Sequence, residues 1–143
     1  MTGPRLHGTD GIRGRVDSHS GDDESALQAL IDQRILSSRA MRIIGEATGL
    51  FLVDYIGESP LVLIGWDRRD GNPELVDALE SGLGAAGCRT MRIGEVPTPG
   101  IHHAVMTCAA DAGMMETASH NPATDSGVNL FDAKGYKSMP ETE

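Results

Sequence analysis

Apolar residues recur every three to four positions in several stretches of the chain, which is the spacing of a helix with one buried face. Ser37 or Ser38 can cap the first long stretch, and Asn72-Pro73 offers a capping side chain followed by a proline suited to a first helical turn. Gly87 can close the second helix. The pattern predicts helices over residues 38–55, 73–87 and 100–110, and a short helical turn over 26–30.

Three short apolar runs bounded by glycine or proline have the length and composition of buried strands. They predict strands over 61–65, 89–93 and 112–116, and a hairpin is expected from Val128 to Lys137. Residues 1–16 and the polar segment 17–25 are expected to be irregular. Strands that alternate with helices through short connections indicate an α/β domain with a mostly parallel sheet.

The loops that follow the predicted strands are where we expect the chemistry, because ligands of such sheets bind at the carboxyl ends of the strands. These loops contain Arg69, the Pro97–Pro99 turn and the Ser119-His120 pair. A serine at a strand end, beside a histidine and a proline-fixed turn, suits a nucleophile that carries a phosphate. On chemistry alone the same residues also suit an ordinary turn rich in serine and asparagine.

The Gly8–Gly14 string near the start of the chain is rich enough in glycine for its backbone to approach a ligand closely. Its Arg13 offers a rigid five-donor fork that matches a phosphate. The alternative is a turn with a solvent-exposed arginine.

Composition narrows the function classes. The 143 residues carry a net charge of −9, which disfavours nucleic-acid binding. No run of residues is long and apolar enough for a membrane span, and Met1–Arg15 contains no apolar leader, so we expect a cytoplasmic protein. Cys88 and Cys108 are expected to be reduced and packed.

Two other motifs are expected to be structural. Gly82–Gly87 satisfies G-x-G-x-x-G, but the string follows a helical pattern and precedes a strand, the reverse of a dinucleotide site. Helix packing and a helix end explain it better. His102 and His103 are adjacent on a predicted helix and point apart, so they cannot converge on one metal.

Two strings, HGTDGIRG at 7–14 and TASHNP at 117–122, together resemble the signature sequences of the alpha-D-phosphohexomutases. That family includes phosphoglucomutases, phosphomannomutases and phosphoglucosamine mutases. The segments GWDRRDGNPEL, VPTP and GVNLFDAKGYK resemble further family sequences, in the same order. The resemblance implies that residues 1–143 are domain I of such an enzyme, a three-layer α/β/α domain with a mixed, mostly parallel sheet.

The resemblance implies intramolecular transfer of phosphate between the 1 and 6 positions of a hexose phosphate, through a hexose 1,6-bisphosphate intermediate. Ser119 matches the serine that carries the phosphate, and with His120 and Arg13 it forms the expected catalytic set. Arg69 and Lys137 are expected to bind substrate phosphate. Mg²⁺ is expected on the phosphate of Ser119 and on aspartates in later domains. Those domains are expected partners that this chain lacks, so the isolated chain is expected to be inactive.

Three residues depart from the family pattern. His7 replaces a phenylalanine, and Glu116 stands where an apolar strand residue is usual. Asn129 stands where the family has a lysine that acts in acid/base chemistry, a role that asparagine cannot take. This last departure favours an alternative hypothesis, a non-catalytic truncated or diverged paralogue that acts as a binding module.

Overall fold

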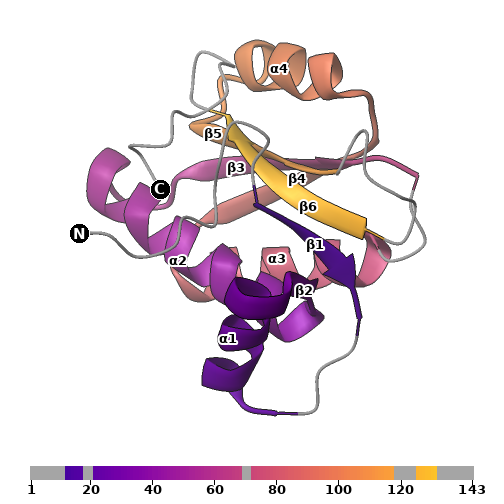
Figure 1. Cartoon of the computed structure of the whole chain (residues 1–143). Coiled ribbons are helices and arrows are strands. Elements are labelled where there is room, and N and C mark those ends of the chain that lie inside the picture. Colours follow the sequence, from indigo (N-terminus) through magenta and orange to yellow (C-terminus); the bar gives the residue numbers. More distant parts are fainter. Residues whose placement is uncertain (1–11, 18–20, 69–71, 118–124, 132–143) are drawn as a thin grey trace.

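The computed structural model describes residues 12–17, 21–68, 72–117 and 125–131. A six-stranded sheet in the order β2-β1-β6-β5-β3-β4 forms the middle of the domain, and helices cover both of its faces (Figure 1). The elements are β1 (Ile12–Val16), α1 (Asp23–Gln33), β2 (Ile35–Leu36), α2 (Ser38–Ile56), β3 (Leu61–Trp66), α3 (Asn72–Ala85), β4 (Arg89–Glu95), α4 (Thr98–Thr107), β5 (Ala112–Glu116) and β6 (Asp125–Phe131).

The sheet is mixed. Strand β3 pairs in parallel with β4 on one side and with β5 on the other, and β1 pairs in parallel with β2. Strand β6 lies between β5 and β1 and is antiparallel to both. The parallel strands are joined through helices, as their geometry requires. The predicted α/β class, with a mixed and mostly parallel sheet, is therefore confirmed.

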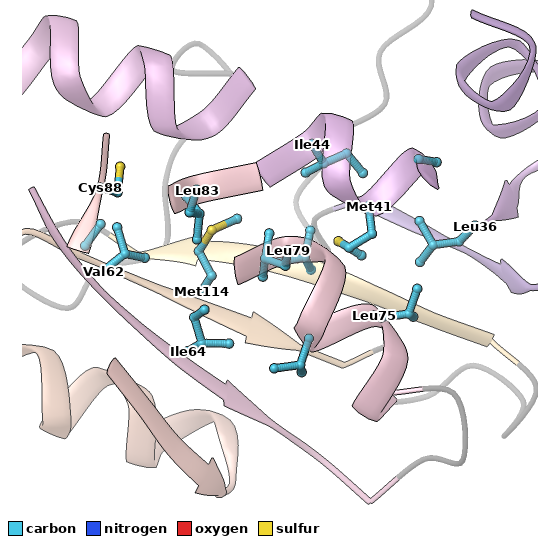
Figure 2. Packing of buried hydrophobic residues seen from close by; sticks show 14 of the residues in the cluster. Leu36, Met41, Ile44, Val62, Ile64, Leu75, Leu79, Leu83, Cys88 and Met114 are labelled. Atoms are coloured by element: carbon cyan, nitrogen blue, oxygen red, sulfur yellow. The ribbon is translucent and has the colours of Figure 1, made fainter. Parts of the chain in front are cut away.

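Two apolar clusters fill the spaces between the three layers. The larger lies between the sheet and helices α2 and α3, where Figure 2 shows Ile64 and Met114 of the sheet facing Leu79 and Leu83 of α3. The smaller lies on the opposite face of the sheet, under α4, and includes Ile101. Side chains of a strand alternate between the two faces, so β3 and β5 contribute to both clusters. Such continuous apolar runs are typical of strands covered on both sides.

The helix boundaries follow from their caps. Ser37 caps α2, because its hydroxyl accepts a hydrogen bond from the backbone N–H of Ala40 at 3.1 Å. Helix α1 is longer than the predicted short turn. It begins within the segment expected to be irregular, because the Asp22 side chain accepts a hydrogen bond from the Ser25 N–H at 2.9 Å. Its acidic first turn also suits the positive end of the helix dipole.

The predicted irregular structure of residues 1–16 is wrong for Ile12–Val16, which form strand β1. Pairing with β6 and β2 makes this a strand, although arginine and glycine dominate its sequence. The short strand β2 was also missed. Strand β6 confirms an extended segment at Val128, but it begins earlier, at Asp125. The predicted second arm of the hairpin lies outside the described residues.

Helices α2 and α3 pack closely through glycine. A β-carbon at Gly82 would overlap the carbonyl oxygen of Arg42 and lie 2.6 Å from the backbone nitrogen of Glu46. Gly87 ends the segment with φ +104°, a conformation that favours glycine. The Gly82–Gly87 string is therefore a packing and helix-ending sequence, as expected, and not a dinucleotide loop.

Candidate functional site

The exits of β3, β4 and β5 lie at one edge of the sheet, as the parallel pairing requires. The backbone N–H of Asp67 donates to the carbonyl of Glu116 at 3.1 Å, and that of Val96 donates to the carbonyl of Trp66 at 3.0 Å. The Arg68 guanidinium also bonds the carboxylate of Glu95 at 3.2 Å. The three predicted ligand loops therefore leave the sheet from neighbouring, mutually bonded positions.

Thr117, the first residue of the TASHNP string, is fixed at the end of β5. Its hydroxyl donates to a carboxylate oxygen of Asp67 at 2.5 Å, and its N–H donates to the carbonyl of Gly127 at 2.9 Å. The side chain is buried. Thr117, two residues before Ser119, is thus bonded to the first residue after β3 on one side and to β6 on the other.

Arg13 lies on β1 and pairs in register with Gly127 on β6. Its Cγ would be 2.8 Å from a β-carbon at Gly127, so the stem of the arginine occupies the space that this glycine leaves open. Strand β6 separates β1 from β5, and Gly127 is the β6 residue bonded to Thr117. Gly127 therefore contacts the Arg13 stem on one side and the first residue after β5 on the other.

Four of the predicted site residues lie outside the described residues. They are Ser119, His120, Arg69 and Lys137. Their assigned roles stay predictions. For two of them the described residues give the point at which the chain leaves the sheet. The segment with Arg69 follows the end of β3, and the segment with Ser119 follows the end of β5.

Glu116, the last residue of β5, is completely buried. Its register partners are Trp66 on β3 and Val128 on β6, so uncharged side chains flank it within the sheet. Burial raises the pKa of this carboxyl well above its ordinary value, and the negative charge of Asp67 raises it further. Sequence reasoning marked Glu116 as a departure but gave it no role.

Asn129, on β6, is 3% exposed and pairs in register with Met115. Strand alternation places it on the face covered by α4, the same face as Arg13. Its side-chain oxygen has no hydrogen-bond partner among the described residues. Buried amide oxygens are seldom left in this state, so the position calls for an explanation.

The described residues contain no group of three histidine, cysteine or acidic side chains placed to bind a metal. The Nε2 atom of the exposed His103 lies 3.3 Å from the hydroxyl oxygen of Thr107. Both cysteines are free thiols. Cys88 is buried, but Cys108 is exposed at the end of α4, so the expectation that both are packed is wrong for Cys108.

No helix in the described parts of the chain has the length and apolar character needed to cross a membrane.

The fold is an α/β/α domain in which Gly127 of β6 pairs with Arg13 of β1 on one side and accepts the N–H of Thr117, at the end of β5, on the other. The family model described as phosphoglucomutase/phosphomannomutase, alpha/beta/alpha domain I, matches residues 4–143. The chain belongs to this family.

Curated relatives include a phosphoglucosamine mutase of Xanthomonas oryzae pv. oryzae, strain PXO99A, which is 40% identical over all 143 residues of this chain. A phosphoglucosamine mutase of Xanthomonas campestris pv. campestris, strain B100, is 39% identical over the same length. The chain spans 28% of the length of each of these relatives.

Among solved structures, a protein of Thermus thermophilus described as a phosphomannomutase is similar with a TM-score of 0.75 and 30% identity. That match covers 99% of this chain and 29% of the other. A phosphoglucomutase/phosphomannomutase family protein of Burkholderia thailandensis gives a TM-score of 0.66 at 27% identity, over 94% of this chain and 27% of its own.

Proposed function

We propose that this chain is the phosphate-carrying domain of a hexose-phosphate mutase. In this proposal residues 1–143 are domain I, and the remaining domains of a longer protein are its partners. Ser119 carries the phosphate, His120 and Arg13 assist it, and Arg69 and Lys137 bind phosphate of the substrate. The curated relatives are phosphoglucosamine mutases, which favours an amino-sugar phosphate as substrate.

The observation that carries the proposal is the position of Arg13 over Gly127. A phosphoserine has a charge of about −1.5 to −2 at neutral pH and needs cations nearby. The planar guanidinium of arginine matches the geometry of phosphate oxygens. The carbonyl of Gly127 accepts the N–H of Thr117, which lies two residues before Ser119. The segment that would hold the phosphate therefore begins beside the stem of an arginine.

The proposed reaction has two transfers. A sugar hydroxyl attacks the phosphorus on Ser119, the bond from phosphorus to the serine oxygen breaks, and a hexose bisphosphate forms. The hydroxyl proton passes to a base, a role that His120 can take. The sugar then reorients, and the Ser119 oxygen attacks the phosphorus of its other phosphate. The bond from that phosphorus to the sugar oxygen breaks, the sugar oxygen takes back a proton from the base, and Ser119 is phosphorylated again. Positioning and charge neutralisation dominate such reactions, which gives Arg13 a direct part.

Mg²⁺ is the proposed cofactor and would supply charge neutralisation at the phosphate. The described residues provide no ligand set of their own. In this proposal the ion is held by the phosphate of Ser119 and by aspartates of the later domains. The cytoplasm, where sugar phosphates are handled, is the proposed location.

Ser119→Ala in the complete protein tests the phosphate carrier directly. We expect mutase activity to disappear and the phosphate on the 118–124 peptide to be absent in the intact-mass and peptide spectra. Full activity in the alanine variant contradicts the proposal. The purified 143-residue chain alone is expected to show no turnover, because the proposed metal and sugar sites lie elsewhere.

Arg13→Ala has a matched control two residues along the same strand. Arg15 is exposed and its guanidinium lies 3.7 Å from the Asp17 carboxylate. Removing one donor from a charge-stabilising site typically lowers kcat by about 10²–10³-fold. We expect such a loss for Arg13→Ala and less than about threefold for Arg15→Ala, as surface changes have small effects. Equal effects of the two substitutions would count against the role of Arg13.

Asn129 supports a second candidate, a binding module without turnover. The buried amide occupies the position of the lysine that the family pattern has there. Asn129→Lys in the complete protein separates the two functions. A strong rise in activity means that the native site is impaired and favours the binding module. An unchanged rate means that another residue serves as the base and favours the mutase.

A further inference from the structure

Asp67 and Thr117 are the first residues after two neighbouring parallel strands. Strand β3 ends at Trp66 and β5 ends at Glu116, and these two residues are register partners. Asp67 and Thr117 therefore leave the sheet from the same row of the ladder. The proposed function gives a phosphate role to each of the two segments that begin here, so the contact between their first residues bears on that function.

Two hydrogen bonds join these strand exits through Asp67. The backbone N–H of Asp67 donates to the carbonyl of Glu116 at 3.1 Å, and the Asp67 carboxylate accepts the hydroxyl of Thr117 at 2.5 Å. The main chain and the side chain of Asp67 are thus bonded to consecutive residues of the other exit. The N–H of Thr117 donates to the carbonyl of Gly127 at 2.9 Å, which holds the main chain of Thr117 against β6.

The bond from the Thr117 hydroxyl to Asp67 lies where water has little access. Thr117 is 3% exposed, and Asp67 is half-buried. Hydrogen bonds to charged acceptors contribute more to stability than bonds between neutral groups, and shielding from water strengthens them. The exposed ion pair of Arg68 and Glu95, which joins the β3 exit to β4 at 3.2 Å, contributes less for the same reason.

A second bond of the same chemical kind lies away from the exits. The hydroxyl of Thr90, near the start of β4, donates to the Glu80 carboxylate of α3 at 2.9 Å. That bond joins a strand to the helix that covers it, at the opposite edge of the sheet from the exits. It therefore provides a matched control, because Thr90→Val and Thr117→Val each remove one bond from a threonine to a carboxylate.

We propose that Asp67 is a positioning residue, whose carboxylate holds the Thr117 hydroxyl in place. The bond sets the start of the segment with Ser119 against the start of the segment with Arg69. The proposal rests on the proposed function, which places the carried phosphate on one segment and a substrate-binding arginine on the other. Phosphoryl transfer depends on the placement of the reacting groups, and a misplacement of about 1 Å can lower a rate by about 10²-fold.

A double-mutant cycle in the 143-residue chain tests whether the two residues act as a pair. Asp67→Ala, Thr117→Val and the double variant are compared with the wild type by urea unfolding. We expect each single change to raise the unfolding constant by about 10- to 100-fold, as for other bonds to charged groups. The double variant should differ from the larger single effect by less than about threefold. Single effects that multiply in the double variant would overturn the proposal.

Coupling between the two exits has a readout that needs no activity. Amide hydrogen exchange is followed in a peptide that contains Asp67 while the residue at 117 is changed. In Thr117→Val we expect exchange of this peptide to accelerate at least about tenfold more than exchange of peptides from α1. Thr117→Ser keeps the hydroxyl and should stay within about threefold of the wild type, and so should Thr90→Val. Equal acceleration of the Asp67 and α1 peptides in Thr117→Val would reduce Thr117 to a general stability residue and overturn the proposal.

Mutase kinetics of the complete protein test the effect on phosphate transfer. Thr117→Val should lower kcat by about 10²-fold and change KM by less than about threefold, because it displaces the proposed phosphate carrier and removes no substrate-binding group. Thr117→Ser should restore kcat to within about threefold of the wild type. A wild-type kcat in Thr117→Val, or an equal loss in Thr90→Val, would overturn the positioning role.

Failure of the proposed function is recorded separately. Full activity in Ser119→Ala would show that this serine does not carry the phosphate. The double-mutant cycle and the exchange measurement would still decide whether Asp67 joins the two exits, since neither uses activity.

Discussion

Replacing Gly82 with alanine is expected to destabilise the domain by about 2 kcal/mol, although alanine is the better helix former. The new methyl group would overlap the carbonyl oxygen of Arg42 and crowd the backbone nitrogen of Glu46. Forcing a carbon into a packed interior typically costs about 1–3 kcal/mol. We take about 3 kcal/mol here because both obstacles are backbone atoms, which cannot rotate away. The higher helix propensity of alanine offsets about 1 kcal/mol.

Gly84 provides the control on the same helix, two residues further along. It is exposed, and a β-carbon there would meet no atom within 4 Å. Only the helix propensity and the smaller entropy of the unfolded chain then act, so Gly84→Ala should stabilise the domain by about 0.5–1 kcal/mol. The same substitution thus changes the free energy of unfolding in opposite directions at two nearby positions. The direction depends on whether the position contacts α2.

Urea unfolding of the wild type and both variants measures the two effects, with the slope of the free energy against urea concentration expected to stay constant. At about 4 °C per kcal/mol for a domain of this size, the melting temperature should fall by about 8 °C for Gly82→Ala and rise by about 3 °C for Gly84→Ala. A Gly82→Ala variant as stable as the wild type would refute the close approach of α2 and α3.

Two further predictions concern a helix cap and the thiols. Ser37→Ala should lower the free energy of unfolding by about 1 kcal/mol, because it removes the acceptor for the Ala40 N–H. Ser38→Ala changes an exposed neighbouring position and should leave the free energy of unfolding nearly unchanged. Thermal melts of the two variants measure both effects. A thiol reagent should modify the exposed Cys108 rapidly, and Cys88 only on unfolding, because burial shields Cys88 and raises the pKa of its thiol; rapid modification of both would contradict this.

The helix that the sequence pattern predicted well has apolar residues that form one continuous face. Helix α2 buries such a face along most of its 19 residues, and its cap was named correctly as one of two serines. Helix α1 buries only Ala26 and Leu30, so its periodic signal covers little more than one turn. Its start depends on the Asp22 cap within a polar run that also suits a loop.

Strand β1 could not be predicted from its own residues. Arginine and glycine have no strand pattern of their own, and the segment is extended because β6 and β2 supply its hydrogen-bond partners from distant parts of the chain. The meeting of three strand exits at one edge of the sheet was predictable for the opposite reason. The rule on the carboxyl ends of parallel strands needs only the order of strands and helices, which periodicity supplies.

The burial of Glu116 follows from pairings on both sides, since β5 lies between β3 and β6 and both faces of the sheet are covered. Asn129 is the register partner of Met115, one pair away from Glu116, and the two departures therefore face opposite layers at the same edge. One departure introduces an acid and the other lacks the positive charge of a lysine. Neither departure supplies positive charge to a phosphate at this edge, so the proposed site must draw its cations from other residues, such as Arg13.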